Sequence, residues 1–335
     1  MLAAWYEKKG QARDVYNIGE LENPEPMPNE VRVRIYASGV NHTDCKRRSG
    51  HGDKDWNYAH HFPDFPIIIP NNDGAGIIDK VGSDVSTFSV GDRVWVFNAR
   101  YRRAFGTAAE FITIPATLIS RLPDNTSFIE GACLGVPAMT AHRCLYSDGD
   151  IAGKNILVTG GAGSVGNYAV QLAKLGKANV ITTVSSSEKA EKVLMADHII
   201  NYRDTDVFSE IMRITDGEGV DRIVDVNLGV HWEINYKILK ENGTITSYSS
   251  MGNRNPSFPH YELMLGNANI RLVMIHCSPF EALQKAADDI TNALKTNSLN
   301  HNVARLFALD KIHESNEAVE SGEMIGNVII QISDN

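Results

Sequence analysis

The residues with the clearest chemical potential form a glycine-rich turn between an apolar segment and a segment of helical spacing. Gly161, Gly163 and Gly166 match the pattern G-x-G-x-x-G directly after the apolar run 156–159. In such a turn the first glycine allows a tight bend, the second lets backbone N–H groups approach a pyrophosphate, and the third packs the helix against the strand. The pattern therefore predicts a dinucleotide site at a helix N-terminus. The other residues of this predicted site are Ala162, Ser164 and Val165.

The residues after the next predicted strand, 180–184, indicate which nicotinamide cofactor fits. An NAD site usually places Asp or Glu about 20 residues past the glycines, where the carboxylate binds the ribose 2′-hydroxyl. Here Ser185 and Ser186 stand at the strand end and Lys189 follows, so hydroxyls and an ammonium are available for a 2′-phosphate. Glu188 is the alternative ribose acceptor, although its place in the first helical turn favours an interaction with the helix dipole. The sequence therefore predicts NADPH rather than NADH.

The composition excludes several classes of partner. The chain has 335 residues, of which 43% are hydrophobic and 22% charged, enough for two globular domains. A formal net charge of −9 offers no basic surface, so we expect neither nucleic acid nor an anionic membrane as partner. Residues 1–9 lack the apolar core of a signal peptide, no segment approaches the roughly 20 apolar residues of a membrane span, and the four cysteines form no C-x-x-C pair. We expect a cytoplasmic protein.

The predicted secondary structure around the glycine turn changes near residue 127, from strands alone to alternating helices and strands. Residues 30–37 alternate apolar and polar side chains, which predicts a half-buried strand in a β-rich region. From residue 127 onward helical patterns alternate with short apolar strands, which is typical of a parallel sheet covered by helices. We expect an α/β fold with a doubly wound Rossmann domain. The predicted parts are a β-rich domain over 1–126, the Rossmann domain over 127–265, and a segment 266–335 that adds an edge strand and returns to the β-rich domain.

Ordered motifs across nearly the whole chain resemble the medium-chain dehydrogenase/reductase superfamily, and within it the zinc-independent quinone oxidoreductases related to ζ-crystallin. Besides the glycine turn, the motifs are the segments 39–44, 73–76, 90–94, 106–111, 139–141 and 200–202. The resemblance implies a GroES-like catalytic domain, a Rossmann domain and an active site in the cleft between them. It also implies a homodimer formed through the edge strand 270–275.

The resemblance further assigns individual residues to the cofactor. It places Asn41 beside the nicotinamide ribose and Thr140 beside the nicotinamide amide. It implies that Lys189 and Tyr202 contact the 2′-phosphate, which agrees with the charge argument above. Tyr248 is expected beside the nicotinamide end of the sheet.

The same resemblance bears on the question of a metal. Zinc alcohol dehydrogenases hold their catalytic zinc with a Cys where this chain has Asn41 and with a His where it has Asn72. Amides are poor zinc ligands compared with thiolate or imidazole. The adjacent residues His60 and His61 lack an evident third ligand. We therefore expect no metal.

Without a Lewis acid, an acceptor that is already electrophilic suits the site better than a saturated alcohol does. Thr43 is then the candidate hydroxyl donor to the oxyanion of the reduced acceptor, with His42 nearby and Asn41 completing the catalytic set. Alternatively, Thr43 and His42 only cap a turn or touch the cofactor.

A loop beyond residue 50 departs from the family pattern, because it is longer and more polar than the resemblance implies and lacks the expected tyrosines. Its candidate substrate residues are His51, Trp56, Tyr58 and His61. The aromatic rings could stack on a planar acceptor, and a histidine could protonate the product. Alternatively, the loop is a surface lid whose aromatic residues pack on the domain.

Three functions therefore remain open. The leading hypothesis is an NADPH-dependent, metal-independent quinone oxidoreductase. The second is an NADPH-dependent reductase of α,β-unsaturated carbonyl compounds, which shares the cofactor site and differs in the acceptor. The third is a catalytically quiet NADPH-binding protein with a sensor or structural role.

Overall fold

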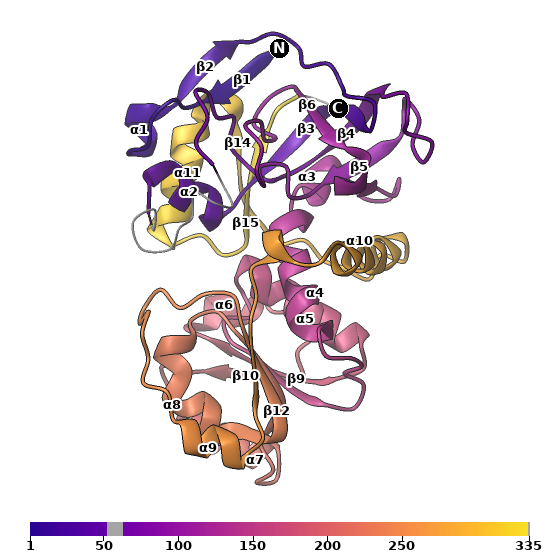
Figure 1. Ribbon diagram of the computed structural model, residues 1–335. Coiled ribbons are helices and arrows are strands. Elements are labelled where there is room, and N and C mark those ends of the chain that lie inside the picture. The colour runs from indigo at the N-terminus through magenta and orange to yellow at the C-terminus, as the bar shows by residue number, and fades with distance from the viewer. Residues whose placement is uncertain (52–62, 334–335) are drawn as a thin grey trace. The chain divides into compact units, whose positions relative to one another are not determined.

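The computed structural model describes residues 1–51 and 63–333. The chain divides into two compact units: Met1–Val136 with Pro279–Asn335, here the β-rich unit, and Pro137–Ser278, here the Rossmann unit (Figure 1). The first boundary lies later than the predicted 126/127, because α3 (Phe128–Gly131) packs on strands β3 and β4 of the β-rich unit. The predicted segment 266–335 is divided at 278/279: the edge strand β13 (Asn269–Leu272) belongs to the Rossmann sheet, as expected, and the rest belongs to the β-rich unit.

A mostly antiparallel sheet forms the β-rich unit, with the strand order β14-β15-β3-β4-β5-β7 and with β6 paired to β3. The predicted strand over 30–37 lies inside β3, and Val31, Val33 and Ile35 are buried as the alternation indicates. Arg32 is buried as well, because its guanidinium forms an ion pair with Asp79 at 2.8 Å. The strands of this sheet are β3 (Glu30–Val40), β4 (Asp73–Val81), β5 (Arg93–Val96), β6 (Phe111–Pro115), β7 (Ile119–Arg121), β14 (Val303–Ala308) and β15 (Asn327–Gln331). Strands β1 (Leu2–Trp5) and β2 (Asn17–Glu20) form a separate two-stranded antiparallel sheet.

Strand β15 pairs antiparallel with β3, so the end of the chain lies in the sheet of the β-rich unit. Helix α2 (His42–Ser49) begins directly after β3. The N–H of its N-cap residue Asn41 donates to the Asp44 carboxylate at 2.9 Å, and Gly50 ends the helix in the left-handed conformation with φ of 79°. The conformation of residues 41–44 is therefore fixed locally. The other helices of this unit are α1 (Ala12–Val15), α3, α10 (Phe280–Lys295) and α11 (Ile312–Ser321).

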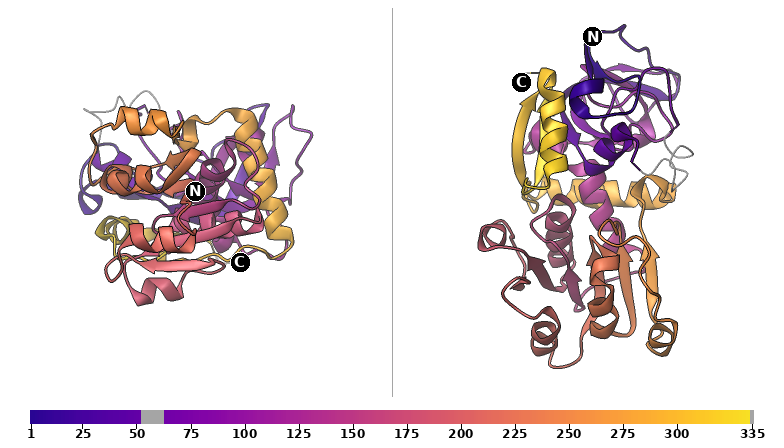
Figure 2. Two further views of the ribbon diagram at one scale, coloured as in Figure 1. Left: turned by 90° about the horizontal axis from the view of Figure 1, so that it is seen from below. Right: turned by 90° about the vertical axis from the view of Figure 1, so that its left-hand side faces the viewer.

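Six parallel strands form the Rossmann sheet in the order β10-β9-β8-β11-β12-β13, which confirms the predicted fold class. The order reverses between β8 and β11, the type of switch point at which open α/β sheets bind ligands. Helices α4 and α5 pack together, as do α7 and α8, and helices cover both faces of the sheet (Figure 2). The strands are β8 (Asn155–Val158), β9 (Asn179–Val184), β10 (His198–Asn201), β11 (Val220–Asp225), β12 (Leu239–Ser247) and β13. The helices are α4 (Met139–Tyr146), α5 (Ser164–Leu175), α6 (Ser187–Glu191), α7 (Val207–Ile214), α8 (Leu228–Ile238) and α9 (His260–Leu265).

The core of the Rossmann unit explains why its strands lack a polar face. Leu157, Ile181, Ile223 and Ile245, from four neighbouring strands, are all buried, as expected for a sheet covered on both sides. The edge strand is shorter than the predicted 270–275, because it ends at Leu272 and a 3-10 turn follows at Ile275–Cys277. Across the described parts of the chain, no helix combines the length and the apolar character that crossing a bilayer requires.

Candidate functional site

The glycine turn joins β8 to α5, and its glycines have different physical roles. Gly160, which the sequence pattern did not single out, has the positive φ of 70° that the bend requires. A Cβ at Gly161 would lie 2.1 Å from Thr182 Oγ1, and a Cβ at Gly166 would lie 2.2 Å from the Gly160 carbonyl oxygen. At Gly163 the nearest heavy atom to such a Cβ is 3.4 Å away. Close packing therefore requires glycine at 161 and 166, whereas Gly163 leaves space for a ligand.

The N-terminus of α5 supplies the donors that a pyrophosphate needs. The helix begins at Ser164, so the N–H groups of Ser164, Val165 and Gly166 have no acceptor inside the helix. The Gly163 N–H instead donates to the Gly160 carbonyl at 3.0 Å and closes the turn. Three free donors, a helix dipole and the open space at Gly163 fit the pyrophosphate of a dinucleotide.

The residues predicted to bind a 2′-phosphate come together at the carboxyl ends of β9 and β10. Lys189 Nζ donates to Ser185 Oγ at 3.0 Å, and Ser186 caps α6 by accepting the Lys189 N–H at 3.3 Å. The Tyr202 N–H donates to the Val184 carbonyl at 3.1 Å, which fixes the residue after β10 beside the end of β9. The Tyr202 side chain is 50% exposed. The Ser185 hydroxyl, the Lys189 ammonium and the Tyr202 phenol are thus available at the carboxyl ends of β9 and β10.

The two residues expected near the nicotinamide lie on neighbouring elements of the Rossmann unit. Thr140 is buried on α4, and Tyr248 directly follows β12, against which α4 packs. Desolvation raises the pKa of the Tyr248 phenol well above its usual value, so the hydroxyl keeps its proton at neutral pH. Glu188 lies exposed in the first turn of α6, the position expected for a partner of the helix dipole.

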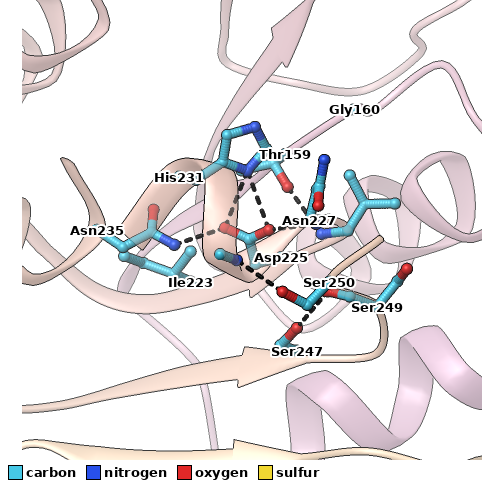
Figure 3. A network of polar contacts seen from close by, with 12 residues as sticks. Thr159, Gly160, Ile223, Asp225, Asn227, His231, Asn235, Ser247, Ser249 and Ser250 are labelled. Atoms are coloured by element: carbon cyan, nitrogen blue, oxygen red, sulfur yellow. Dashed lines mark hydrogen bonds and ion pairs between the residues drawn. The ribbon is translucent and has the colours of Figure 1, made fainter. Parts of the chain in front are cut away.

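A buried carboxylate that the sequence did not predict lies at the carboxyl end of the sheet and accepts several hydrogen bonds (Figure 3). Asp225, the last residue of β11, accepts hydrogen bonds from the Asn227 N–H at 2.6 Å, from His231 Nδ1 at 3.0 Å and from Asn235 Nδ2 at 2.5 Å. The Val226 N–H donates to Thr159 Oγ1 at 3.0 Å, directly before the glycine turn. The sequence carried a signal, because His231 and Asn235 are four residues apart and face one side of α8.

The predicted catalytic residues of the β-rich unit lie at the start of α2. Asn41 Nδ2 donates to Asp73 at 2.7 Å, and Asn72 Nδ2 donates to Asp44 at 2.8 Å. Asn72 Oδ1 accepts the N–H of Arg100 at 3.1 Å. Both amides are therefore held by a buried network in which their nitrogens face carboxylates.

Burial controls the charges around this network. It raises the pKa of Asp44 to about 6, and together with the neighbouring charge of Asp44 it raises the pKa of Asp73 well above its ordinary value. Desolvation and then the charge of Lys46 lower the pKa of His42, so the imidazole is neutral at pH 7 and is a poor proton donor. Thr43 Oγ1 is buried and has no hydrogen-bond partner. Its hydroxyl can therefore donate to an added group.

Comparisons with known proteins agree with this architecture. The model of the alcohol dehydrogenase GroES-like domain matches residues 27–124, and that of the zinc-binding dehydrogenase matches residues 164–292. A zinc-type alcohol dehydrogenase-like protein of Schizosaccharomyces pombe is 30% identical over 343 residues, which cover 93% of this chain and 94% of that protein. The chain belongs to the medium-chain dehydrogenase/reductase superfamily.

This medium-chain reductase is also similar to quinone oxidoreductases. Human quinone oxidoreductase is 27% identical over 308 residues, which cover 90% of this chain and 89% of that protein. The structure of Escherichia coli quinone oxidoreductase complexed with NADPH has a TM-score of 0.84 at 25% identity and covers 99% of this chain and 100% of that one. The predicted superfamily and its GroES-like and Rossmann domains are confirmed, and the protein is an oxidoreductase.

The residues of this medium-chain reductase do not fit the zinc of its zinc-dependent relatives. By the family resemblance, Asn41 and Asn72 stand where those enzymes have ligands, and here the amide nitrogens of both residues donate to carboxylates. Over residues 1–51 and 63–333, no three His, Cys, Asp or Glu side chains are grouped to hold a metal ion. Amides fixed in this way are unsuitable for Zn²⁺.

The predicted substrate loop is described only at its start. His51 directly follows Gly50 at the end of α2, and its N–H donates to the Lys46 carbonyl at 3.0 Å. Trp56, Tyr58 and His61 lie outside the described residues.

Proposed function

We propose that this medium-chain reductase transfers hydride from NADPH to a quinone without the help of a metal. The observation that carries the choice of cofactor is the hydrogen bond between Lys189 and Ser185, at the strand end where an NAD site has an acid. The amides at Asn41 and Asn72 support metal independence. The quinone oxidoreductases among its relatives support the acceptor class.

In this proposal the chain binds and orients the reactants. The N–H groups of residues 164–166 bind the pyrophosphate, and Ser185, Ser186, Lys189 and Tyr202 bind the 2′-phosphate. NADPH, when bound, supplies the hydride. The Thr43 hydroxyl, which has no partner of its own, donates to the oxyanion of the reduced acceptor, and water supplies the proton because His42 is neutral. A quinone suits this set because it is electrophilic without a Lewis acid.

The experiment that tests the proposal is oxidation of NADPH, with NADH for comparison, by 1,4-benzoquinone, 9,10-phenanthrenequinone and a simple enone after treatment with a chelator. We expect quinone turnover that prefers NADPH and survives chelation. Turnover of the enone alone would favour the reductase of α,β-unsaturated carbonyls. NADPH binding without turnover of any acceptor would favour the sensor or structural role, and loss of activity on chelation would contradict metal independence.

We propose in addition that the protein is a homodimer formed through β13. This edge strand carries Leu272, which is 73% exposed, and the neighbouring helix α9 carries the exposed Tyr261, Met264 and Leu265. Apolar side chains grouped on a sheet edge suit pairing with a second copy. Cys45, Cys133 and Cys144 are buried thiols outside any disulfide, which supports the cytoplasm as the compartment.

A further inference from the structure

A small cavity lies inside the β-rich unit beside the first turn of α2. Its volume is about 10 Å³, and its wall includes Tyr6, Thr43, Asp44, Arg47 and Arg100. A space of this size holds one group as large as a water molecule. The cavity lies wholly within the β-rich unit and is separate from the glycine turn.

The main feature of this cavity is the guanidinium of Arg100. The residue is only 3% exposed, and neither Nη1 nor Nη2 has a hydrogen-bond partner. Its backbone N–H is held by Asn72 Oδ1 at 3.1 Å, so the main chain is fixed at the cavity wall. A buried cation is costly unless its donors are satisfied. The cavity therefore presents two unsatisfied charged donors.

Among the neighbouring groups, the Tyr6 phenol interacts with this guanidinium, whereas Asp44 does not accept a hydrogen bond from it. The two oxygens of Asp44 accept from the Asn41 N–H at 2.9 Å and from Asn72 Nδ2 at 2.8 Å. Arg47, a second cation on the wall, pairs with Asp64 at 3.1 Å. The charge of Arg47 is thus offset by Asp64, and Arg100 lies beside Asp44, which makes no hydrogen bond to it.

Thr43 adds a neutral donor to the same wall. Its buried Oγ1 has no partner, so its one proton is available either to an occupant of this cavity or to the acceptor oxyanion of the proposed function. Asn71 also lines the cavity and has an unpaired Oδ1, which is an acceptor. A water molecule, which both accepts and donates, is therefore the competing occupant.

We propose that this cavity binds a singly charged anion of about the size of a water molecule, held by the two Nη atoms of Arg100. The two Nη atoms of Arg100 are charged donors without an acceptor, and charged donors favour an anion over water. Two sources have this chemistry: a free halide ion, or one carboxylate oxygen of the acceptor molecule. The second source rests on the proposed function, whereas the first is independent of it.

The primary test compares sodium bromide with sodium gluconate at equal ionic strength, since gluconate is too large for the cavity. Bromide should raise the Tm of the wild-type protein by about 2 to 4 °C more than gluconate does. The variant Arg100→Gln should lose this difference. The matched control Arg102→Gln, at an exposed arginine two residues away, should keep it. Equal effects of the two salts on the wild-type protein would overturn the proposal and indicate bound water.

A second measurement covers the case in which Arg100→Gln fails to fold. Wild-type crystals grown in bromide should show an anomalous peak within hydrogen-bond distance of the Arg100 Nη atoms, and its absence would contradict the anion site. To distinguish the sources, kcat/KM is compared for 2-carboxy- and 2-methyl-1,4-naphthoquinone. If the acceptor supplies the anion, Arg100→Gln lowers kcat/KM about tenfold for the carboxylated quinone alone, and bromide competes with it. If bromide does not compete, the anion is a free ion. The absence of turnover with every acceptor would contradict the proposed function, but the Tm and crystallographic tests of the anion site would still be valid.

Discussion

Lys189 Nζ lies 3.0 Å from Ser185 Oγ, so the ammonium is held at the carboxyl end of β9. There Val184, the last residue of β9, pairs with Asn201, the last residue of β10. This contact places a positive charge and a hydroxyl together at the site where a ribose 2′-phosphate is expected. It carries the preference for NADPH that we propose.

Replacing Lys189 by Ala should weaken NADPH binding by about 1 to 2 kcal/mol and leave NADH binding nearly unchanged, because only NADPH forms the charge-assisted hydrogen bond. Tyr202→Phe should act in the same direction through loss of the phenol donor. Isothermal titration with both cofactors measures the effects. Lys192→Ala, at an exposed lysine at the C-terminal end of α6, is the control and should change neither affinity. Equal losses for both cofactors would show that Lys189 and Tyr202 do not recognise the 2′-phosphate.

The glycine turn allows packing and ligand binding to be separated. Gly166→Ala should lower the free energy of unfolding by about 2 to 4 kcal/mol, because the added Cβ would lie 2.2 Å from a carbonyl oxygen. Gly163→Ala should leave the Tm of the ligand-free protein unchanged, because its φ of −72° suits alanine and the nearest atom is 3.4 Å away. It should nevertheless weaken NADPH and NADH alike, as thermal shift and titration would reveal. A Gly163→Ala protein with unchanged cofactor affinity would contradict the pyrophosphate site.

The raised pKa of Asp44 predicts a pH dependence of stability. Its pKa rises from 3.8 to about 6 on folding, so the folded protein retains a proton that the unfolded chain loses between these values. This contribution is therefore complete below about pH 4 and is lost as the pH rises through about 6, a change of about 3 kcal/mol. Urea unfolding of the wild-type protein and of Asp44→Asn at pH 4.5, 5.5 and 7 measures it. The stability of the wild type relative to the variant should fall with rising pH, and parallel pH profiles would contradict the shift.

The proposed dimer predicts a change of mass on mutation of the edge strand. Leu272→Lys should convert the dimer to a monomer, because the substitution places a charge on an apolar strand edge. Light scattering after size-exclusion chromatography measures the mass. Leu194→Lys, at a 43% exposed leucine elsewhere in the Rossmann unit, is the matched control and should remain dimeric. A monomeric wild type, or a Leu272→Lys protein that stays dimeric, would rule out this interface.

The alternation in 30–37, the apolar strands and the glycine pattern predicted both units because periodicity and turn composition are local properties. The roles inside the turn were less predictable. The positive φ belongs to Gly160 rather than Gly161, since the backbone conformation depends on how the turn meets Thr182 on the next strand. The role of Asp225 was not predicted, because its hydrogen-bond partners His231 and Asn235 lie on α8 and only folding brings them to the end of β11.

The sequence by itself determined the superfamily, the parallel sheet with its dinucleotide turn, and the presence of amides at Asn41 and Asn72. Only the tertiary structure decided what those residues contact. Asn41 and Asn72 donate to Asp73 and Asp44, from segments that are distant in the chain, and burial of these carboxylates then sets their pKa values. Burial by the tertiary structure likewise leaves the Nη atoms of Arg100 without hydrogen-bond partners. Hydrogen-bond partners and desolvation depend on which surfaces folding brings together, and no local pattern of residues contains that information.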